Sequence, residues 1–203
     1  MFLELADYRL RVAELYAQVR DEAVPILERH ARFVEARDEL FKTHPQSPLS
    51  SEQKEAFVGL SYYPYDPDYR FELEPELNVE PETFEIPLRD DGAVRIRRVA
   101  TVTLPLKTPA ETLTNLSLFW VTGYGGGLFL PFRDATNEGE TYGGGRYLLD
   151  TIKHADLGQR EGRLVLDFNF AYHPSCAYNP KWDCPLAPFE NKLSAPIVAG
   201  EKL

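Results

Sequence analysis

The sequence predicts an α+β fold in which N-terminal helices pack on a mainly antiparallel β-sheet, closed as a barrel or folded as a sandwich. Two observations indicate this fold class. Apolar residues recur every three or four positions over residues 3–41, as on one face of a helix, and from about residue 83 they alternate with polar residues, as in strands. No long helical pattern separates the successive strand patterns, which favours antiparallel pairing.

The N-terminal part contains three predicted helices. The first spans Leu3 to Arg20, and the second follows Pro25 and ends before His44-Pro45, because a residue that precedes proline avoids the helical conformation. The run Ser50-Ser51-Glu52-Gln53 is typical of a capping box, in which the first hydroxyl and the last amide bond free backbone groups at the start of a short helix.

A change of period marks the β part of the chain. Residues 61–69 hold prolines and aspartates too close together for a regular element, so they connect the helices to the sheet. Strands are expected at Thr83 to Leu88, Ala93 to Leu104, Thr112 to Thr122, Gly127 to Arg133, Glu140 to Asp150 and Arg163 to Tyr172. The first two flank Asp90-Asp91-Gly92, which predicts a hairpin turn.

Length and composition are those of a single globular domain. The chain has 203 residues, of which 43% are hydrophobic and 27% charged. We divide it into a helical segment (1–60), an antiparallel β segment (61–172) and an irregular C-terminal tail (173–203). No apolar stretch approaches the roughly 20 residues needed to span a bilayer, and Met1 to Asp7 carries acids where a signal peptide carries bases. We therefore expect a cytoplasmic protein without membrane contact.

The formal net charge is -10, and the acidic excess is concentrated between Asp66 and Asp91. The glutamates in that run are spaced as on a solvated strand or loop face, and they lack the ligand spacing of a calcium loop. Most of the surface would repel DNA or RNA, so we expect no nucleic-acid partner.

The last third of the chain carries the densest polar chemistry. In the strand predicted over 163–172, Leu164 and Leu166 fall on one face and Asp167 and Asn169 on the other. If the apolar face packs the core, the polar pair points to water or pairs across the strand. If the polar face lines a closed barrel, the pair forms the floor of a cavity, and the buried carboxylate needs a cationic partner. Arg146 or Arg133 could supply that cation.

The run Gly143-Gly144-Gly145 lies inside another predicted strand. Glycines weaken a strand unless the chain bends there or something packs closely on the bare backbone. Sheet curvature is one interpretation. The other is a cradle for an anion, with exposed amides beside Arg146.

His173, Cys176 and Cys184 form a poor match to a metal site, because structural zinc normally has four ligands with closely spaced cysteine pairs. We expect no metal and no cofactor, and both thiols buried under the tail as small apolar groups. A nucleophilic cysteine would need a base, and His173 is the one histidine near in sequence.

These observations favour a binding module for a small polar or anionic molecule. Arginine offers a planar donor fork, tyrosine a flat apolar wall, and aspartate with asparagine fixes the ligand's orientation. The expected ligand-binding residues are Arg133, Tyr142, Arg146, Asp167, Asn169, Tyr178 and Asn179. One alternative is a hydrolase or isomerase that uses Asp167 or Asp134 as general acid or base. Another is a structural or partner-binding protein, in which the N-terminal helices form a homodimer contact.

Several blocks resemble one family. They are Phe132 to Thr136, Glu140 to Leu148, Leu166 to Tyr172, Pro174 to Pro180 and Cys184 to Pro188. Together they are similar to domain-of-unknown-function family 1684, a group of bacterial and archaeal proteins of about this size. The resemblance implies no settled activity and no catalytic residues. His173 departs from it, because the family pattern implies asparagine there, and this departure counts against a ligand or base role for His173.

Overall fold

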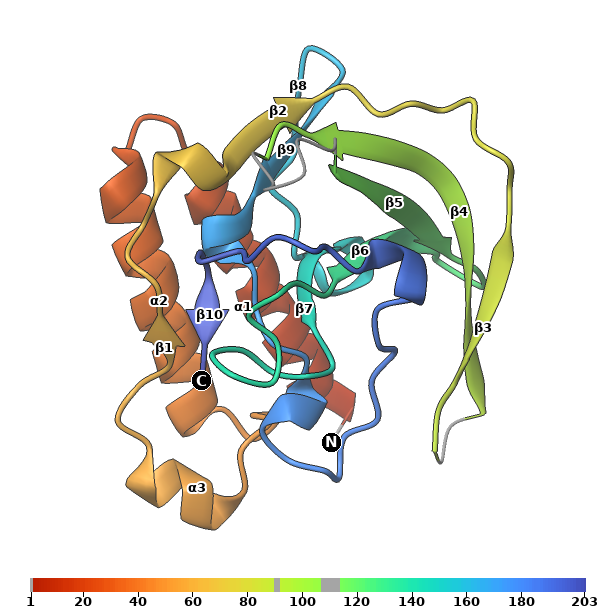
Figure 1. The fold of residues 1–203 in the computed structure, drawn as a ribbon. Coiled ribbons are helices and arrows are strands. Elements are labelled where there is room, and N and C mark those ends of the chain that lie inside the picture. Colours follow the sequence, from red (N-terminus) through yellow and green to blue (C-terminus); the bar gives the residue numbers. More distant parts are fainter. Residues whose placement is uncertain (1, 90–91, 107–113) are drawn as a thin grey trace.

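Three helices form the N-terminal part of the chain and stand beside the sheets (Figure 1). The computed structural model describes residues 2–89, 92–106 and 114–203. The helices are α1 (Phe2–Arg20), α2 (Ile26–Thr43) and α3 (Ser51–Ala56). The capping box is confirmed, since Ser50 accepts from the Gln53 backbone while the Gln53 side chain accepts from the Ser50 backbone. No helix in the described part of the chain is long and apolar enough to cross a membrane.

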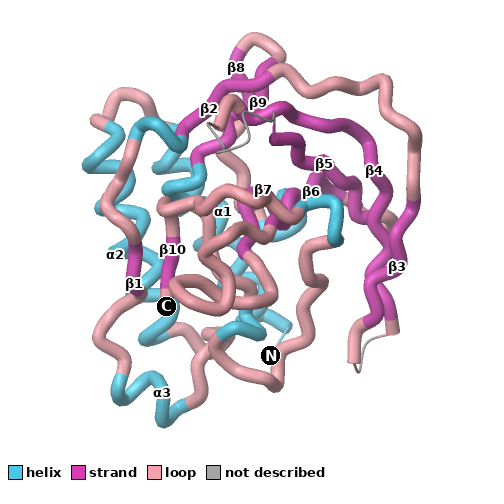
Figure 2. The backbone as a smooth tube through the Cα atoms, viewed as in Figure 1, coloured by secondary structure: helices cyan, strands magenta, loops and turns pink. Residues whose placement is uncertain are grey.

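Antiparallel sheets make up the rest of the fold (Figure 2). The largest sheet pairs β3 (Thr83–Pro87), β4 (Ala93–Leu104), β5 (Thr114–Val121), β6 (Gly127–Phe132) and β7 (Arg146–Asp150) in chain order. A second sheet has the order β2 (Arg70–Leu73), β9 (Arg163–Asp167), β8 (Gln159–Arg160), and a third pairs β1 (Ser61–Tyr62) with β10 (Glu201–Lys202).

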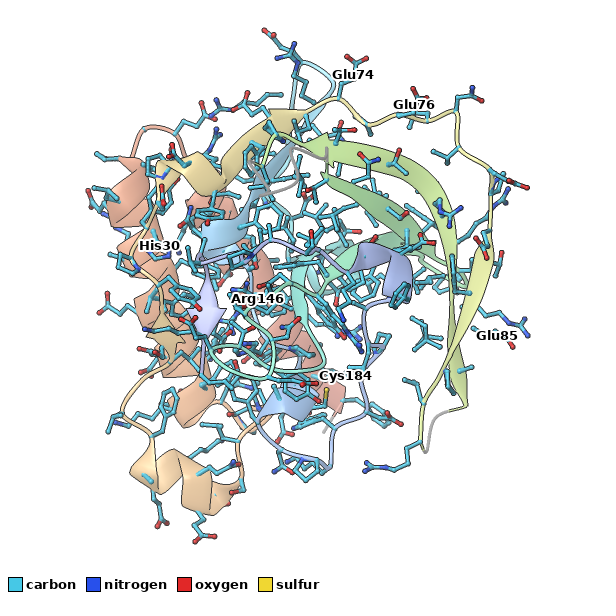
Figure 3. The ribbon with its side chains drawn as sticks, viewed as in Figure 1. His30, Glu74, Glu76, Glu85, Arg146 and Cys184 are labelled. Carbon is cyan, nitrogen blue, oxygen red and sulfur yellow. The ribbon has the colours of Figure 1, made fainter. Side chains whose placement is uncertain are left out.

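The predicted α+β class is confirmed, and the barrel alternative is wrong. Within the described residues β3 and β7 lie at opposite ends of the five-stranded sheet, which does not close on itself. The hairpin of β3 and β4 is present, whereas its expected turn at Asp90-Asp91 and the expected strand start at Thr112 lie outside the described residues. The acidic run is a solvated face as expected, with Glu74, Glu76 and Glu85 at the outer rim (Figure 3).

Two strands are shorter than we predicted. A local turn follows the end of β9, and another precedes the start of β7. β9 stops at Asp167, because its carboxylate accepts a hydrogen bond from the Asn169 backbone and starts a 3-10 turn over Phe168–Phe170. β7 begins at Arg146 instead of residue 140, because the preceding glycines form a turn. The connection 61–69 also holds a strand, β1, where we expected no regular element.

Strand β9 lies between two hydrophobic cores. Leu164 and Leu166 pack with the five-stranded sheet, whereas Val165 packs with Leu15 and Phe33 of the two long helices. The predicted alternation therefore holds up to Asp167. The polar face of this strand is turned toward the helices and faces neither solvent nor the inside of a barrel.

The C-terminal tail, which we expected to be irregular, contains two 3-10 turns and the short strand β10, and it is anchored at defined points. Asn191 donates to the carbonyls of Ser117 and Pro131 and accepts from the Ser117 backbone, so one side chain bridges β5 and β6. Past this anchor the chain returns to the helices as β10, which brings Glu201 beside Arg37 of α2.

The glycine run provides a test of the turn. Gly145 has φ +93, and a Cβ there would lie 2.4 Å from the carbonyl oxygen of Phe132. Gly145→Ala should therefore lower the free energy of unfolding by about 2 kcal/mol or more. Gly143→Ala is the control, because its Cβ would meet only the flexible Glu138 side chain, and it should cost less than about 1 kcal/mol. Urea denaturation measures both, and equal losses would contradict a backbone constraint at Gly145.

Candidate functional site

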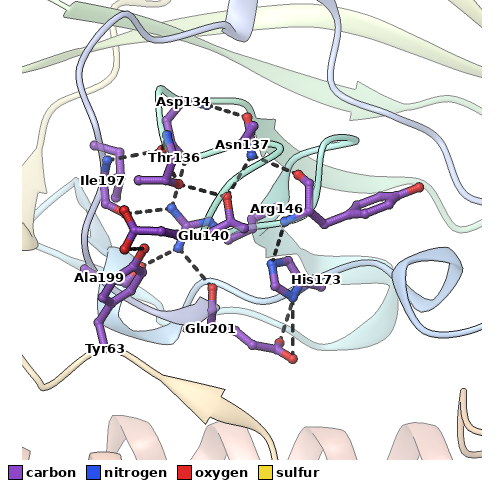
Figure 4. A network of polar contacts seen from close by, with 12 residues as sticks. Tyr63, Asp134, Thr136, Asn137, Glu140, Arg146, His173, Ile197, Ala199 and Glu201 are labelled. Atoms are coloured by element: carbon purple, nitrogen blue, oxygen red, sulfur yellow. Dashed lines mark hydrogen bonds and ion pairs between the residues drawn. The ribbon is translucent and has the colours of Figure 1, made fainter. Parts of the chain in front are cut away.

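Arg146, an expected ligand-binding residue, is fully buried and bonded on both guanidinium branches (Figure 4). Its Nη2 lies 2.9 Å from the Asp134 carboxylate and donates to the Ile197 carbonyl at 2.8 Å. Its Nη1 donates to the carbonyls of Ala199 and Glu201. Arg146 therefore fastens the C-terminal tail to the start of β7.

Asp134 completes this anchor from a tight turn. One of its oxygens accepts from the backbone and hydroxyl of Thr136, at 2.8 and 2.6 Å, and also from the Ile197 backbone. Thr136 in turn shares a hydrogen bond with Thr141. The polar groups of the turn are thus occupied by one another and by the tail, as in a structural network.

Asp167 lies in a different neighbourhood, so the expected pairing with Arg146 or Arg133 is wrong. Its carboxylate accepts from the Tyr65 hydroxyl at 3.0 Å and from the backbone and amide of Asn169. The guanidinium Nε of Arg70 lies 3.9 Å from the same carboxylate. Asn169 itself bonds the backbone of the 61–69 connection, through Asp66.

The remaining expected residues are also dispersed. The Tyr142 hydroxyl lies 3.8 Å from the Cys176 sulfur, and the Tyr178 hydroxyl donates to Glu201. Asn179 accepts from a backbone amide within its own turn. Arg133 binds the tail through its backbone, and its buried Nε has no partner in the described part of the chain. Their role in ligand binding stays a prediction.

A partly open cavity of about 90 Å³ lies where α1 and α2 meet the chain around residues 172–175. Aromatic rings provide much of its wall, from Tyr8, Tyr16, Phe41, Tyr147 and Tyr172. Arg37, Lys153 and His173 add polar atoms. The volume exceeds that of a single water molecule, and it admits a small molecule or the end of a longer one.

Arg37 is the central charged group of this cavity. Only 7% exposed, it donates through Nη2 to Glu201 at 3.0 Å, and its guanidinium lies 5.0 Å from the Tyr172 ring centre and 5.3 Å from that of Phe41. Its Nε has no hydrogen-bond partner among the described residues, and neither has the hydroxyl of Tyr16, which is 3% exposed. Native proteins leave few buried donors unpaired.

Arg37, its partner Glu201 and Tyr16 differ in ionisation. Burial alone would raise the pKa of the Glu201 carboxyl, but Arg37, His173 and Tyr178 more than offset it, and the pKa is lowered. Burial raises the pKa of Tyr16, so its hydroxyl remains a neutral donor. Glu201 is therefore an ionised carboxylate that compensates Arg37, while Arg37 and Tyr16 bring hydrogen-bond donors to the lining of the cavity.

A second cleft, of about 130 Å³, lies beside Asp167. Its charged lining comprises Arg20, Glu22, Arg29, Arg70, Arg160 and Asp167. Burial raises the pKa of Asp167, and the hydrogen bonds from Asn169 and Tyr65 only partly counter this. The cleft thus combines several guanidinium groups with a carboxyl whose pKa lies above its ordinary value.

The protein has an α+β fold, and the helices α1 and α2 meet the start of the C-terminal tail around the 90 Å³ cavity. This chain belongs to the family described as "Protein of unknown function (DUF1684)", whose model matches residues 55–202. The resemblance seen in the sequence is confirmed. The whole of α1 and α2 precedes the match, so Tyr16 and Arg37 lie outside it, whereas His173 and Glu201 lie within it.

One solved structure is similar over most of both chains. It is the solution NMR structure of an uncharacterized protein from Haloarcula marismortui, with 37% sequence identity and a TM-score of 0.60. The similarity covers 84% of this chain and 90% of that one. No curated protein matches this sequence. The comparisons therefore support the family and the fold and assign no activity.

The tail anchor generates a stability prediction. Arg146→Ala should lower the free energy of unfolding by about 3–5 kcal/mol, because it leaves the Asp134 carboxylate buried without its cation. Arg32→Ala is the control, since Arg32 and its partner Glu28 are each about half exposed, and it should cost no more than about 0.5 kcal/mol. A loss below about 1 kcal/mol for Arg146→Ala in urea denaturation would contradict the anchor.

Proposed function

We propose that the protein binds a small polar or anionic molecule in the cavity between α1, α2 and residues 172–175. One observation carries the proposal: two buried donors without partners in the described part of the chain, the Arg37 Nε and the Tyr16 hydroxyl, belong to residues that line the same cavity. A buried donor left unpaired costs about 1–3 kcal/mol. An acceptor inside the cavity would remove that cost for both groups.

The lining favours an acceptor-rich ligand, such as a small carboxylate. Arg37 and Tyr16 offer donors, and Lys153 adds an ammonium that also pairs with Asp150 at 3.2 Å. Glu201 is occupied by Arg37, His173 and Tyr178. The aromatic walls match the flat apolar part of an organic acid better than a fully hydrated inorganic ion.

The proposed site uses the residue types that we expected from the sequence, but at other positions in the chain. Arginine and tyrosine remain the proposed ligand-binding groups, but Arg37 and Tyr16 take the place that we assigned to Arg146 and Tyr142. Tyr178 contributes indirectly, because its hydroxyl holds the Glu201 carboxylate that orients Arg37.

Tyr16→Phe tests the proposal, because it removes one hydroxyl and nothing else. Formate, acetate and lactate should raise the melting temperature of the natural protein, and Tyr16→Phe should weaken binding of the best of them by about tenfold or more. Without ligand, the variant should be no less stable, since the lost hydroxyl is unpaired. Tyr124→Phe, at a fully exposed position, is the control. The proposal fails if no carboxylate stabilises the protein or if the two variants bind alike.

A second candidate function is enzymatic, with Asp167 as general acid. The observation in its favour is the raised pKa of this buried carboxyl in a cleft that also contains Arg29 and Arg70. The arginines would hold an anionic substrate, and Asp167 would donate a proton to the leaving group. Asp134 is a weaker candidate, because Arg146 pairs with it inside the buried anchor.

The enzymatic alternative has its own test, with p-nitrophenyl phosphate and p-nitrophenyl acetate as probes. Turnover by Asp167→Asn should fall by at least about 100-fold if Asp167 is the acid. The rate should decline as pH rises through the Asp167 pKa, which lies above its ordinary value, because the protonated form is the active one. Asp68→Asn, at an exposed site, should leave turnover unchanged. Equal rates in both variants would exclude the role.

A further inference from the structure

Cys176 and Cys184 meet in space although seven residues separate them. Cys176 lies in the 3-10 turn Ser175–Ala177, and its backbone N–H donates to the Cys184 sulfur at 3.3 Å. The two thiols are also close enough for each to shift the pKa of the other. Both are free and partly exposed, so the expectation of thiols buried under the tail is wrong (Figure 3 labels Cys184).

Contacts to other parts of the fold hold the Cys184 end of this loop in place. The Tyr147 hydroxyl, on β7, donates to the Pro185 carbonyl at 2.6 Å, next to Cys184. The Trp182 indole donates to the Pro48 carbonyl at 3.0 Å. The sulfurs are therefore adjacent because the surrounding fold fixes the loop.

The two thiols differ in acidity. The hydrogen bond from the Cys176 thiol, the backbone N–H and the nearby Lys153 ammonium lower the pKa of Cys184 to about 7. The same thiol–thiol bond and burial raise the pKa of Cys176 well above its ordinary value. A partly exposed, more acidic thiol beside a less acidic one is the usual division between an attacking and a resolving cysteine.

We propose that Cys176 and Cys184 form a thiol–disulfide exchange site whose substrate is the disulfide of a low-molecular-weight thiol, with Cys184 as the attacking group. Neither sulfur lines the proposed carboxylate cavity, but the two sites share Tyr147 and Lys153.

In the first step the Cys184 thiolate attacks one sulfur of the substrate. The substrate S–S bond breaks, one thiolate leaves, and a mixed disulfide forms on Cys184. Cys176 then gives its proton to the released thiolate and attacks the Cys184 sulfur, which expels the second thiolate. That thiolate takes a proton from water. The protein dithiol loses two electrons and the substrate disulfide gains them.

Oxidised glutathione is the probe. The full-length protein should lose two hydrogen atoms in mass, release two reduced glutathiones per chain and return to the dithiol with dithiothreitol. Cys176→Ser should stop at one glutathione bound to Cys184. Cys184→Ser should react at least about tenfold more slowly at pH 7, because it lacks the acidic thiol. Equal rates for the two variants, or a natural protein that stops at the mixed disulfide, would overturn the proposal.

A measurement on the unaltered chain guards against variants that fail to fold. Iodoacetamide alkylation, mapped by peptide mass spectrometry across a pH series, should label Cys184 first, with half of the maximal rate near pH 7. Preferential labelling of Cys176, or a half-maximal pH above 8.5, the value of an ordinary free thiol, would also overturn the assignment.

Discussion

The buried ion pair of Arg146 with Asp134 is the interaction on which the rest of the structure depends. Arg146 also binds the carbonyls of Ile197, Ala199 and Glu201, so a single guanidinium sets the path of the tail. That path puts the Glu201 side chain against Arg37, which would otherwise be a buried cation without compensation. The helical pair, the tail and the cavity between them are therefore linked through one side chain that faces none of the free space.

The sequence predicted those parts of the fold that local patterns determine. The apolar faces of α1 and α2 and the capping box at Ser50 depend on residues three and four positions apart. They could therefore be predicted without tertiary information. The start of β7 and the end of β9 could not be predicted. Polar and apolar residues still alternate in the sequence at positions where the backbone has already turned. Asp167 ends one strand through its own side chain, and the positive φ of Gly145 precedes the other.

The candidate site was much less predictable than the fold. Arg146 and Asp167 both lie in polar segments of the sequence. Their partners, Asp134 and Tyr65, are determined by the three-dimensional course of the chain. Arg37 could have been singled out from the sequence, since it lies on the apolar face of α2, four residues from Phe33 and four residues from Phe41. An arginine there requires a buried counter-charge. Its partner lies 164 residues away, and no local pattern reveals it.

The long separation between Arg37 and Glu201 has a consequence for biosynthesis. A ribosome releases α2 long before β10, so the helical pair must exist for a time with its arginine hydrated and its aromatic face uncovered. Contacts so distant in the chain are slow to form, and incomplete chains with exposed apolar faces aggregate readily. The cavity therefore cannot form until β10 has been synthesised, and until then the aromatic face of the helical pair is open to non-specific association.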